Sequence, residues 1–163
     1  MKTAYVGIGS NIGDRHQNCL KATQMMREIP GSELLAISGW YLTRPVGVVG
    51  QEWYVNGVAS LWTSVSAREL LGHLFRIESH MGRVRSERWD PRIIDLDILL
   101  FGNDIIDSKD LKVPHPLMHI RRFVLVPLAQ LAPNMIHPSL GLAITELLKR
   151  LPEDDREVVA IKE

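Results

Sequence analysis

Two aspartates, Asp95 and Asp97, lie one residue apart in a run of isoleucine and leucine. If this run is a strand, the side-chain period of two places both carboxylates on one face and turns Leu96 and Ile98 toward the core. Two carboxylates so close together on a largely buried strand destabilise each other's charged form unless a cation neutralises them. The pair therefore predicts a site for Mg²⁺, which prefers carboxylate oxygens.

The spacing of the two aspartates permits one metal ion or two. Residues i and i+2 of a strand have Cα atoms roughly 6.5 Å apart, and their carboxylates can converge on a pair of ions about 4 Å apart. An Asp-x-Asp pattern also occurs on the wet face of a half-exposed sheet. The metal interpretation therefore depends on the residues nearby.

Four arginines and no lysine precede the aspartate pair: Arg83, Arg85, Arg88 and Arg92. The planar guanidinium group matches phosphate oxygens in a bidentate manner, although such a cluster can equally be a solvated basic surface. Beside metal-binding carboxylates it indicates phosphoryl-group chemistry, in which metal ions and arginines stabilise charge. The sequence has neither the Gly-rich Lys-Ser/Thr loop of common nucleotide triphosphatases nor the protein-kinase motifs, so we expect a different scaffold.

Aromatic and amide side chains elsewhere predict a pocket for a planar heterocycle. Tyr54 and Asn56 flank the apolar Val55, so both point to the same face of a strand. An aromatic face can stack on a ring, while an amide offers a donor and an acceptor to the ring edge. Trp40 and Phe123 are further candidates, and each is also explained by core packing.

His115 lies between Pro114 and Pro116. It is either a turn residue or, when protonated, a ligand to phosphate. The sequence offers it no cysteine or histidine partners for a zinc site.

Composition restricts the class of protein. The chain carries 19 basic and 19 acidic side chains, so its formal net charge is zero. This argues against broad binding to nucleic acid or to an anionic membrane, and any anion site must be local. The single cysteine excludes an internal disulfide, fits a reducing compartment and is expected to be a small buried hydrophobe.

Length and hydropathy predict a single domain over residues 1–163, which we expect to function as a monomer. No apolar run approaches the ~20 residues of a membrane span, and the first residues lead directly into a strand-like segment. We therefore expect a cytoplasmic protein without a signal peptide.

Hydrophobic periodicity predicts the order β-α-β-β-α-β over the first hundred residues. This is the order of the ferredoxin-like split unit, an α+β fold with a mainly antiparallel sheet and both helices on one face. Ser66, with Glu69 three positions later, forms a capping box that starts the second helix. The strands are expected at 4–10, 33–43, 54–62 and 95–101, and the helices at 15–29 and 66–82. Additional short strands near 105, 111–113 and after 157, and C-terminal helices at 123–131 and 142–150, complete the prediction.

The segment from Arg88 to Asp97 reads Arg-Trp-x-Pro-Arg-x-x-Asp-x-Asp, which closely resembles the signature of the hydroxymethyl-dihydropterin pyrophosphokinases of the folate pathway. The resemblance spans most of the chain and implies a ferredoxin-like α+β fold. It also implies transfer of the terminal diphosphate of ATP to the hydroxymethyl group of the pterin, with release of AMP. The other matching motifs, in order, are Gly9-Ser10-Asn11, Thr43-x-Pro45-x-Gly47, Tyr54-x-Asn56, Gly82-Arg83-x-Arg85, Val113-Pro114-His115 and Arg121-x-Phe123.

The resemblance implies a role for each matching residue. Asp95 and Asp97 would hold two Mg²⁺ ions, and Arg83 and Arg92 would stabilise the migrating diphosphate. The ATP side would comprise Arg85, Arg88, Trp89, Arg92, Ile98, His115 and Arg121. The pterin side would comprise stacking Tyr54 and Phe123, the amide of Asn56, and backbone groups of Thr43, Pro45 and Val46.

The chain departs from the family pattern in two respects. One residue fewer than expected separates Arg85 from Arg88, so the division of roles between Arg83 and Arg85 stays open. Phe75 and Pro116 occupy positions where polar contacts to adenine are expected, so adenine recognition would depend on backbone groups, around Ile98 for example.

Two segments, 45–51 and 83–91, have the glycine or polar content of mobile lids. We expect them to close over ATP and to exclude water from the transfer.

Two other functions remain open on the sequence. A ferredoxin-like sheet with aromatics can stack RNA bases, but the neutral charge and the lack of an aromatic ribonucleoprotein motif count against this. A Mg²⁺-dependent phosphohydrolase would use the same aspartates. An assay with ATP, Mg²⁺ and the hydroxymethyl pterin separates the three: AMP formed only with pterin, phosphate released without pterin, or neither product.

Overall fold

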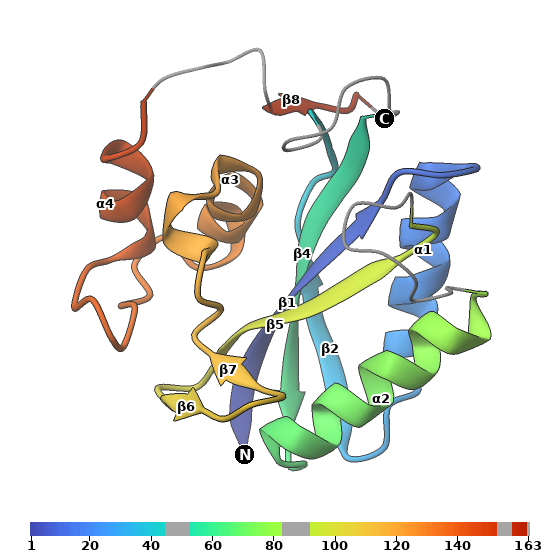
Figure 1. Cartoon of the computed structure of the whole chain (residues 1–163), viewed down its shortest axis with the longest axis horizontal. Coiled ribbons are helices and arrows are strands. Elements are labelled where there is room, and N and C mark those ends of the chain that lie inside the picture. Colours follow the sequence, from blue (N-terminus) through green and yellow to red (C-terminus); the bar gives the residue numbers. More distant parts are fainter. Residues whose placement is uncertain (45–52, 83–91, 153–157, 163) are drawn as a thin grey trace.

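The computed structural model describes residues 1–44, 53–82, 92–152 and 158–162, and its centre is a six-stranded antiparallel sheet (Figure 1). The strand order is β5-β1-β4-β3-β8, and β2 also pairs with β4. β1 is therefore enclosed on both sides. The strands are β1 (Lys2–Ser10), β2 (Ser32–Ile37), β3 (Tyr41–Thr43), β4 (Tyr54–Thr63), β5 (Asp95–Phe101) and β8 (Val158–Ala160).

Helices cover both faces of this sheet (Figure 1). On one face lie α1 (Arg15–Met26) and α2 (Ala67–His80), as the β-α-β-β-α-β order predicts. The C-terminal helices α3 (Arg122–Leu131) and α4 (Ile144–Lys149) lie on the other face. Each face of the sheet has its own apolar core. The core under α1 and α2 includes Ile8 and Leu96, and the core under α3 and α4 includes Val58 and Leu125. The ferredoxin-like α+β prediction is confirmed.

The single strand predicted at 33–43 is wrong, because the chain leaves the ladder between β2 and β3. The hydroxyl of Ser38 accepts a hydrogen bond of 2.8 Å from the Val58 amide, where a backbone carbonyl would act in a regular strand. The Trp40 ring lies against Gly57, where an added Cβ would come within 2.6 Å of ring carbons. Trp40 is only 4% exposed, so its core-packing interpretation is confirmed.

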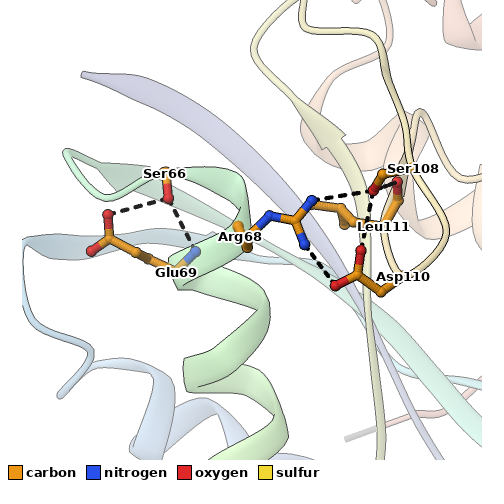
Figure 2. A network of polar contacts seen from close by, with 6 residues as sticks. All are labelled: Ser66, Arg68, Glu69, Ser108, Asp110 and Leu111. Carbon is orange, nitrogen blue, oxygen red and sulfur yellow. Dashed lines mark hydrogen bonds and ion pairs between the residues drawn. The ribbon is translucent and has the colours of Figure 1, made fainter.

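The predicted start of α2 is confirmed in detail (Figure 2). The Ser66 oxygen accepts a hydrogen bond of 3.1 Å from the Glu69 amide, and its hydroxyl donates to the Glu69 carboxylate. Arg68, in the first turn, reaches across to Asp110 and Ser108. This polar network ties the start of α2 to the segment after β5.

The helix predicted at 15–29 is shorter than expected. α1 ends at Met26, and the amides of Glu28 and Ile29 donate to carbonyls three residues back, which is a tightened last turn. Within α1, Cys19 is fully buried, and burial raises the pKa of its thiol to about 12. This confirms its prediction as a small buried hydrophobe.

The C-terminal part agrees broadly with the prediction. Short strands β6 (Ile106–Asp107) and β7 (Lys112–Val113) pair with each other, and the last strand, β8, joins the main sheet at β3. α4 is shorter than the predicted 142–150, and a 3₁₀ turn at Met118–Ile120 was not expected. In the described part of the chain, no helix has the length and apolar character needed to cross a membrane.

Candidate active site

Two glycines of β1 align the predicted acceptor residues with the predicted metal ligands. Gly9 pairs with Asn56 of β4 on one side and with Asp95 of β5 on the other, and Gly7 pairs with Asp97. Directly paired residues of antiparallel strands point to the same face, so Asn56, Gly9 and Asp95 form a row across the sheet. Because neighbouring strands are about 4.8 Å apart, the Cα atoms at the two ends of this row lie roughly 10 Å apart.

The two aspartates lie on the face opposite α1 and α2. Leu96 and Ile98 are buried in the core beneath those helices, whereas Asp95 and Asp97 alternate with them and are partly exposed. The expected alternation is confirmed. The aspartates therefore share a face with Asn56 and with α3.

Gly9 leaves the space in which the Asn56 amide lies. A Cβ at position 9 would come within 2.6 Å of Asn56 Oδ1, so no larger residue fits without moving the amide. The Asn56 Nδ2 donates a hydrogen bond to the buried hydroxyl of Thr43. The resemblance assigned Thr43 a backbone role, and its side chain also orients the amide.

Arg92 meets the aspartate pair at the start of β5. Its Nη1 lies 3.3 Å from Asp95 Oδ2, and both side chains are about one-quarter exposed. Asn11 holds the backbone of Arg92 with two hydrogen bonds. The Asn11 Oδ1 accepts from the backbone amide of Arg92 at 2.7 Å, and the backbone amide of Asn11 donates to the Arg92 carbonyl. The end of β1 therefore fixes the beginning of the predicted metal segment.

His115 is joined to β5 through its backbone, because its amide donates a hydrogen bond of 2.9 Å to the Leu99 carbonyl. Burial and the nearby charge of Arg121 lower the pKa of His115 to about 4, and Asp95 opposes them in part. Its Nδ1 accepts a hydrogen bond of 3.1 Å from the Leu117 amide, so the neutral ring carries its proton on Nε2. Without a ligand, the lowered pKa therefore favours the neutral ring near pH 7, with Nε2 as its donor, and both interpretations of His115, a turn residue or a ligand to phosphate, stay predictions.

Arg121 and Phe123 bring the two predicted subsites together. The guanidinium carbon of Arg121 lies 5.6 Å from the centre of the Phe123 ring, a cation–π contact. Phe123 lies in the first turn of α3, which packs against β4, and its side chain is partly buried against the core that includes Val58 and Leu125. A predicted nucleotide residue thus touches a predicted pterin residue.

Of Ile98, only the backbone is available for the predicted contact with adenine. The side chain is 4% exposed and belongs to the core beneath α1 and α2. β5 ends the strand order, so alternate residues direct their backbone groups away from β1 toward the open edge. Phe75 and Pro116, the two departures from the family pattern, are both exposed.

Six predicted site residues lie outside the described residues, and so do the segments expected to act as lids. These six are Pro45, Val46, Arg83, Arg85, Arg88 and Trp89.

The residues present fit Mg²⁺ better than zinc. Among the described residues, no group of three or more histidine, cysteine, aspartate or glutamate side chains surrounds a common point. Asp95 and Asp97 thus supply two carboxylates. This is the donor set typical of Mg²⁺, which takes one or two protein carboxylates and completes its shell with water and substrate phosphates, whereas a structural zinc site needs four protein ligands.

Reasoning from the sequence did not identify the structural roles of Gly9 and Asn11. The signal was present, because glycine is uncommon inside a strand and often marks a close approach of another group. β1 carries glycine at positions 7 and 9, in the middle of a β-branched run.

Comparison with known proteins identifies a family. Residues 5–133 match the model of 7,8-dihydro-6-hydroxymethylpterin-pyrophosphokinase. A 2-amino-4-hydroxy-6-hydroxymethyldihydropteridine pyrophosphokinase of Pseudomonas aeruginosa is 43% identical over 152 residues, which cover 93% of both chains. One of the same name from Haemophilus influenzae is 40% identical over 153 residues, covering 94% of this chain and 95% of the relative.

Solved structures with a similar fold include the Plasmodium falciparum HPPK-DHPS wild type. It superimposes with a TM-score of 0.74 over 91% of this chain at 15% identity. The present chain spans less than half of that protein, 44% of its length. At this identity the likeness concerns the fold.

Proposed function

This chain belongs to the 7,8-dihydro-6-hydroxymethylpterin-pyrophosphokinase family, and from that premise we propose that its reaction takes place on the sheet face between Asn56 and the Asp95–Asp97 pair. The activity is ATP-dependent transfer of diphosphate to the hydroxymethyl group of 6-hydroxymethyl-7,8-dihydropterin, with release of AMP, in folate biosynthesis. The row formed by Asn56, Gly9 and Asp95 is the observation that carries the location.

The pterin would lie at the Asn56 end of the row. The Asn56 amide, oriented by Thr43, would bind the polar edge of the ring, and Tyr54 and Phe123 would stack on its faces. Pro45 and Val46 would contribute backbone contacts. The glycine surface of β1 leaves room for the hydroxymethyl group to point toward Asp95.

The triphosphate of ATP would lie at the other end. Asp95 and Asp97 would hold one or two Mg²⁺ ions, which when bound neutralise phosphate charge and polarise the phosphoryl oxygens. Arg92, together with Arg83, would stabilise the migrating diphosphate, Arg121 would contact the nucleotide, and His115 would donate from Nε2 to a phosphate oxygen. Arg85, Arg88 and Trp89 would complete this side, and backbone groups near Ile98 would bind adenine.

None of the described residues at the site is placed as a strong general base. His115 already uses Nδ1 as an acceptor, so its neutral ring has no free lone pair for a proton. Phosphoryl transfer depends on positioning and charge stabilisation, and the attacking hydroxyl can lose its proton late. We propose that Asp95 or Asp97 accepts this proton.

We also propose the domain organisation, oligomeric state, cellular location and partners of this protein. The chain forms one domain over residues 1–163, acts as a monomer in the cytoplasm, and has small molecules rather than nucleic acid or membrane as partners. The zero net charge and the single buried cysteine support these proposals.

A product assay tests the location and the reaction together. The wild type should form AMP only when ATP, Mg²⁺ and the hydroxymethyl pterin are all present, and Asn56→Ala should raise the pterin KM about tenfold or more, because a buried hydrogen-bonding group is lost. The ATP KM of that variant should stay within twofold of the wild type. An unchanged pterin KM in Asn56→Ala would overturn the proposed pterin position.

A further inference from the structure

Glu78 is a buried carboxylate near the end of α2, on a helix face otherwise buried through Leu70, Leu74 and Ile77. It is 2% exposed. Glutamate is almost never fully buried unless its carboxylate is paired or hydrogen-bonded, since removing the charge from water is costly. Its place in the fold therefore requires a specific partner.

That partner includes the backbone of Leu96. Glu78 Oε2 accepts a hydrogen bond of 2.8 Å from the Leu96 amide, and Leu96 is the residue between Asp95 and Asp97. β5 is the end strand of the sheet path, and the Leu96 amide points away from β1 toward this edge. A buried edge amide without an acceptor would be strongly unfavourable, and a carboxylate acceptor makes a stronger bond than a neutral one.

The Leu96 peptide is thus fixed from three directions. Gly9 and Gly7 of β1 pair with the residues on either side of it, and its own side chain is buried in the core. Glu78 supplies the third restraint, from the helix layer. The carboxylates of Asp95 and Asp97 leave the chain immediately before and after this peptide, so their separation depends on its orientation.

We propose that Glu78 is a positioning residue that sets the separation and direction of the Asp95 and Asp97 carboxylates through the Leu96 amide. This inference rests on the proposed metal-binding role of the two aspartates. Glu78 reaches Leu96 from the side of α2, opposite the aspartate face, and acts through the backbone. A displacement of about 1 Å in catalytic groups can cost about a hundredfold in rate, so a single hydrogen bond at this point has a large effect on turnover.

Two variants separate the hydrogen bond from the charge. Glu78→Gln keeps an oxygen acceptor of the same length without the charge, and Glu78→Met removes the acceptor at similar volume. We expect Glu78→Met to lower kcat about 10- to 100-fold and to raise the Mg²⁺ concentration for half-maximal turnover about tenfold. Glu78→Gln should restore most of both. The pterin dissociation constant should stay within twofold of the wild type in both variants, because Tyr54 and Asn56 lie on β4.

Leu74→Ala is the matched control, since Leu74 lies on the same buried face of α2. It should lower the thermal midpoint while keeping the wild-type Mg²⁺ dependence. If Glu78→Met instead behaves as Leu74→Ala does, with reduced stability and an unchanged Mg²⁺ dependence, Glu78 has only a packing role and the proposal is overturned.

Hydrogen exchange gives a readout that does not depend on activity or on the folding of Glu78→Met. In the wild type, the Leu96 amide should exchange as slowly as amides of the β1–β4 ladder, and Glu78→Gln should accelerate it moderately. Exchange of Leu96 at the rate of exposed loop amides in the wild type would contradict the proposal.

Asp97→Ala in the same Mg²⁺ titration distinguishes a failure of the proposed metal assignment from a failure of the positioning role of Glu78. If Asp97→Ala keeps the wild-type Mg²⁺ dependence, the metal assignment itself is wrong, and the positioning role fails with it. If Asp97→Ala loses that dependence and Glu78→Met does not, only the positioning role is wrong.

Discussion

The start of α2 and the sheet face around Asp95 both bring charged side chains together, but the charges are arranged differently in the two places. At the start of α2, Arg68 and Asp110 approach within 2.6 Å, and more than half of each side chain is exposed (Figure 2). On the sheet face, Asp95 and Asp97 lie side by side, and Arg92 approaches Asp95 at 3.3 Å with both partly buried. The first region pairs opposite charges in water, whereas the second holds two like charges on one face of a strand with an arginine beside them.

The difference distinguishes a structural network from a site. Each pair in the first region neutralises itself in water, and such exposed pairs contribute about 0–1 kcal/mol to stability. In the second region, adjacent carboxylates beside arginines make electrostatic sense when Mg²⁺ and phosphates bind there. The exposed pairs are therefore explained by the scaffold alone, whereas the adjacent aspartates are the pair for which we propose a metal-binding role.

The largest contrast should come from removing one aspartate in each region. Asp97→Ala should lower the rate of AMP formation about a thousandfold, because the metal ion that we propose Asp97 holds would supply several kcal/mol of charge stabilisation in the transition state. Pterin affinity, measured by calorimetry, should remain within twofold of the wild type. Asp110→Ala is the control and should keep full activity. Retained turnover in Asp97→Ala would show that the aspartates on the sheet face do not have the catalytic role that separates them from the Arg68–Asp110 pair.

The second prediction concerns the loss of folding stability at acid pH, which we expect from His115 at the sheet-face site. His115 has a pKa of about 4 in the folded protein against an ordinary value of 6.5, so between these values only the unfolded chain takes up the proton. Stability is therefore lost as the pH falls from 6.5 to 4, by on the order of 3 kcal/mol.

Urea unfolding at pH 7 and at pH 4.5 measures this loss, and His115→Asn should reduce it. Burial also lowers the pKa of His137, so part of the slope should remain in the variant. An identical pH slope in His115→Asn and the wild type would show that His115 is not buried as described.

The third contrast is within β1. Gly9→Ala should weaken pterin binding about 10- to 100-fold, because the new Cβ would displace the Asn56 amide and break a buried hydrogen bond. Gly7→Ala is the matched control, since its Cβ would meet only the flexible end of Leu99 at 3.4 Å. Calorimetry with the pterin tests both variants. Equal losses would mean that the row does not depend on Gly9.

The smallest effect belongs to the network at the start of α2. Arg68→Ala should lower the free energy of unfolding by less than about 1 kcal/mol, and less still at high salt, since the pair is exposed and screened. Its AMP formation should equal that of the wild type. A loss of activity in this variant would mean that the two regions are coupled.

The sequence predicted most of the fold, because its apolar spacing and its Ser66–Glu69 cap are local signals. It did not predict the interruption between β2 and β3. That interruption depends on the Ser38 hydroxyl replacing a ladder acceptor and on Trp40 covering Gly57, two contacts between segments distant in the chain. Nor did it predict the lowered pKa of His115, since that shift comes from burial by other elements and from the charge of Arg121.

By itself, the sequence determined which chemical groups are available, and from them it predicted paired carboxylates for a metal, arginines for phosphate, and an aromatic and amide set for a ring. Residue types and short spacings carry that information, because they fix which atoms are available and which share a face of a strand. Only the tertiary structure decided how these groups meet. The register of β1 between β4 and β5 places Asn56, Gly9 and Asp95 in one row, and the fold of α2 over β5 brings Glu78 to the Leu96 amide. Such pairings join residues far apart in the chain, and their geometry is set by packing and hydrogen bonding across the whole sheet.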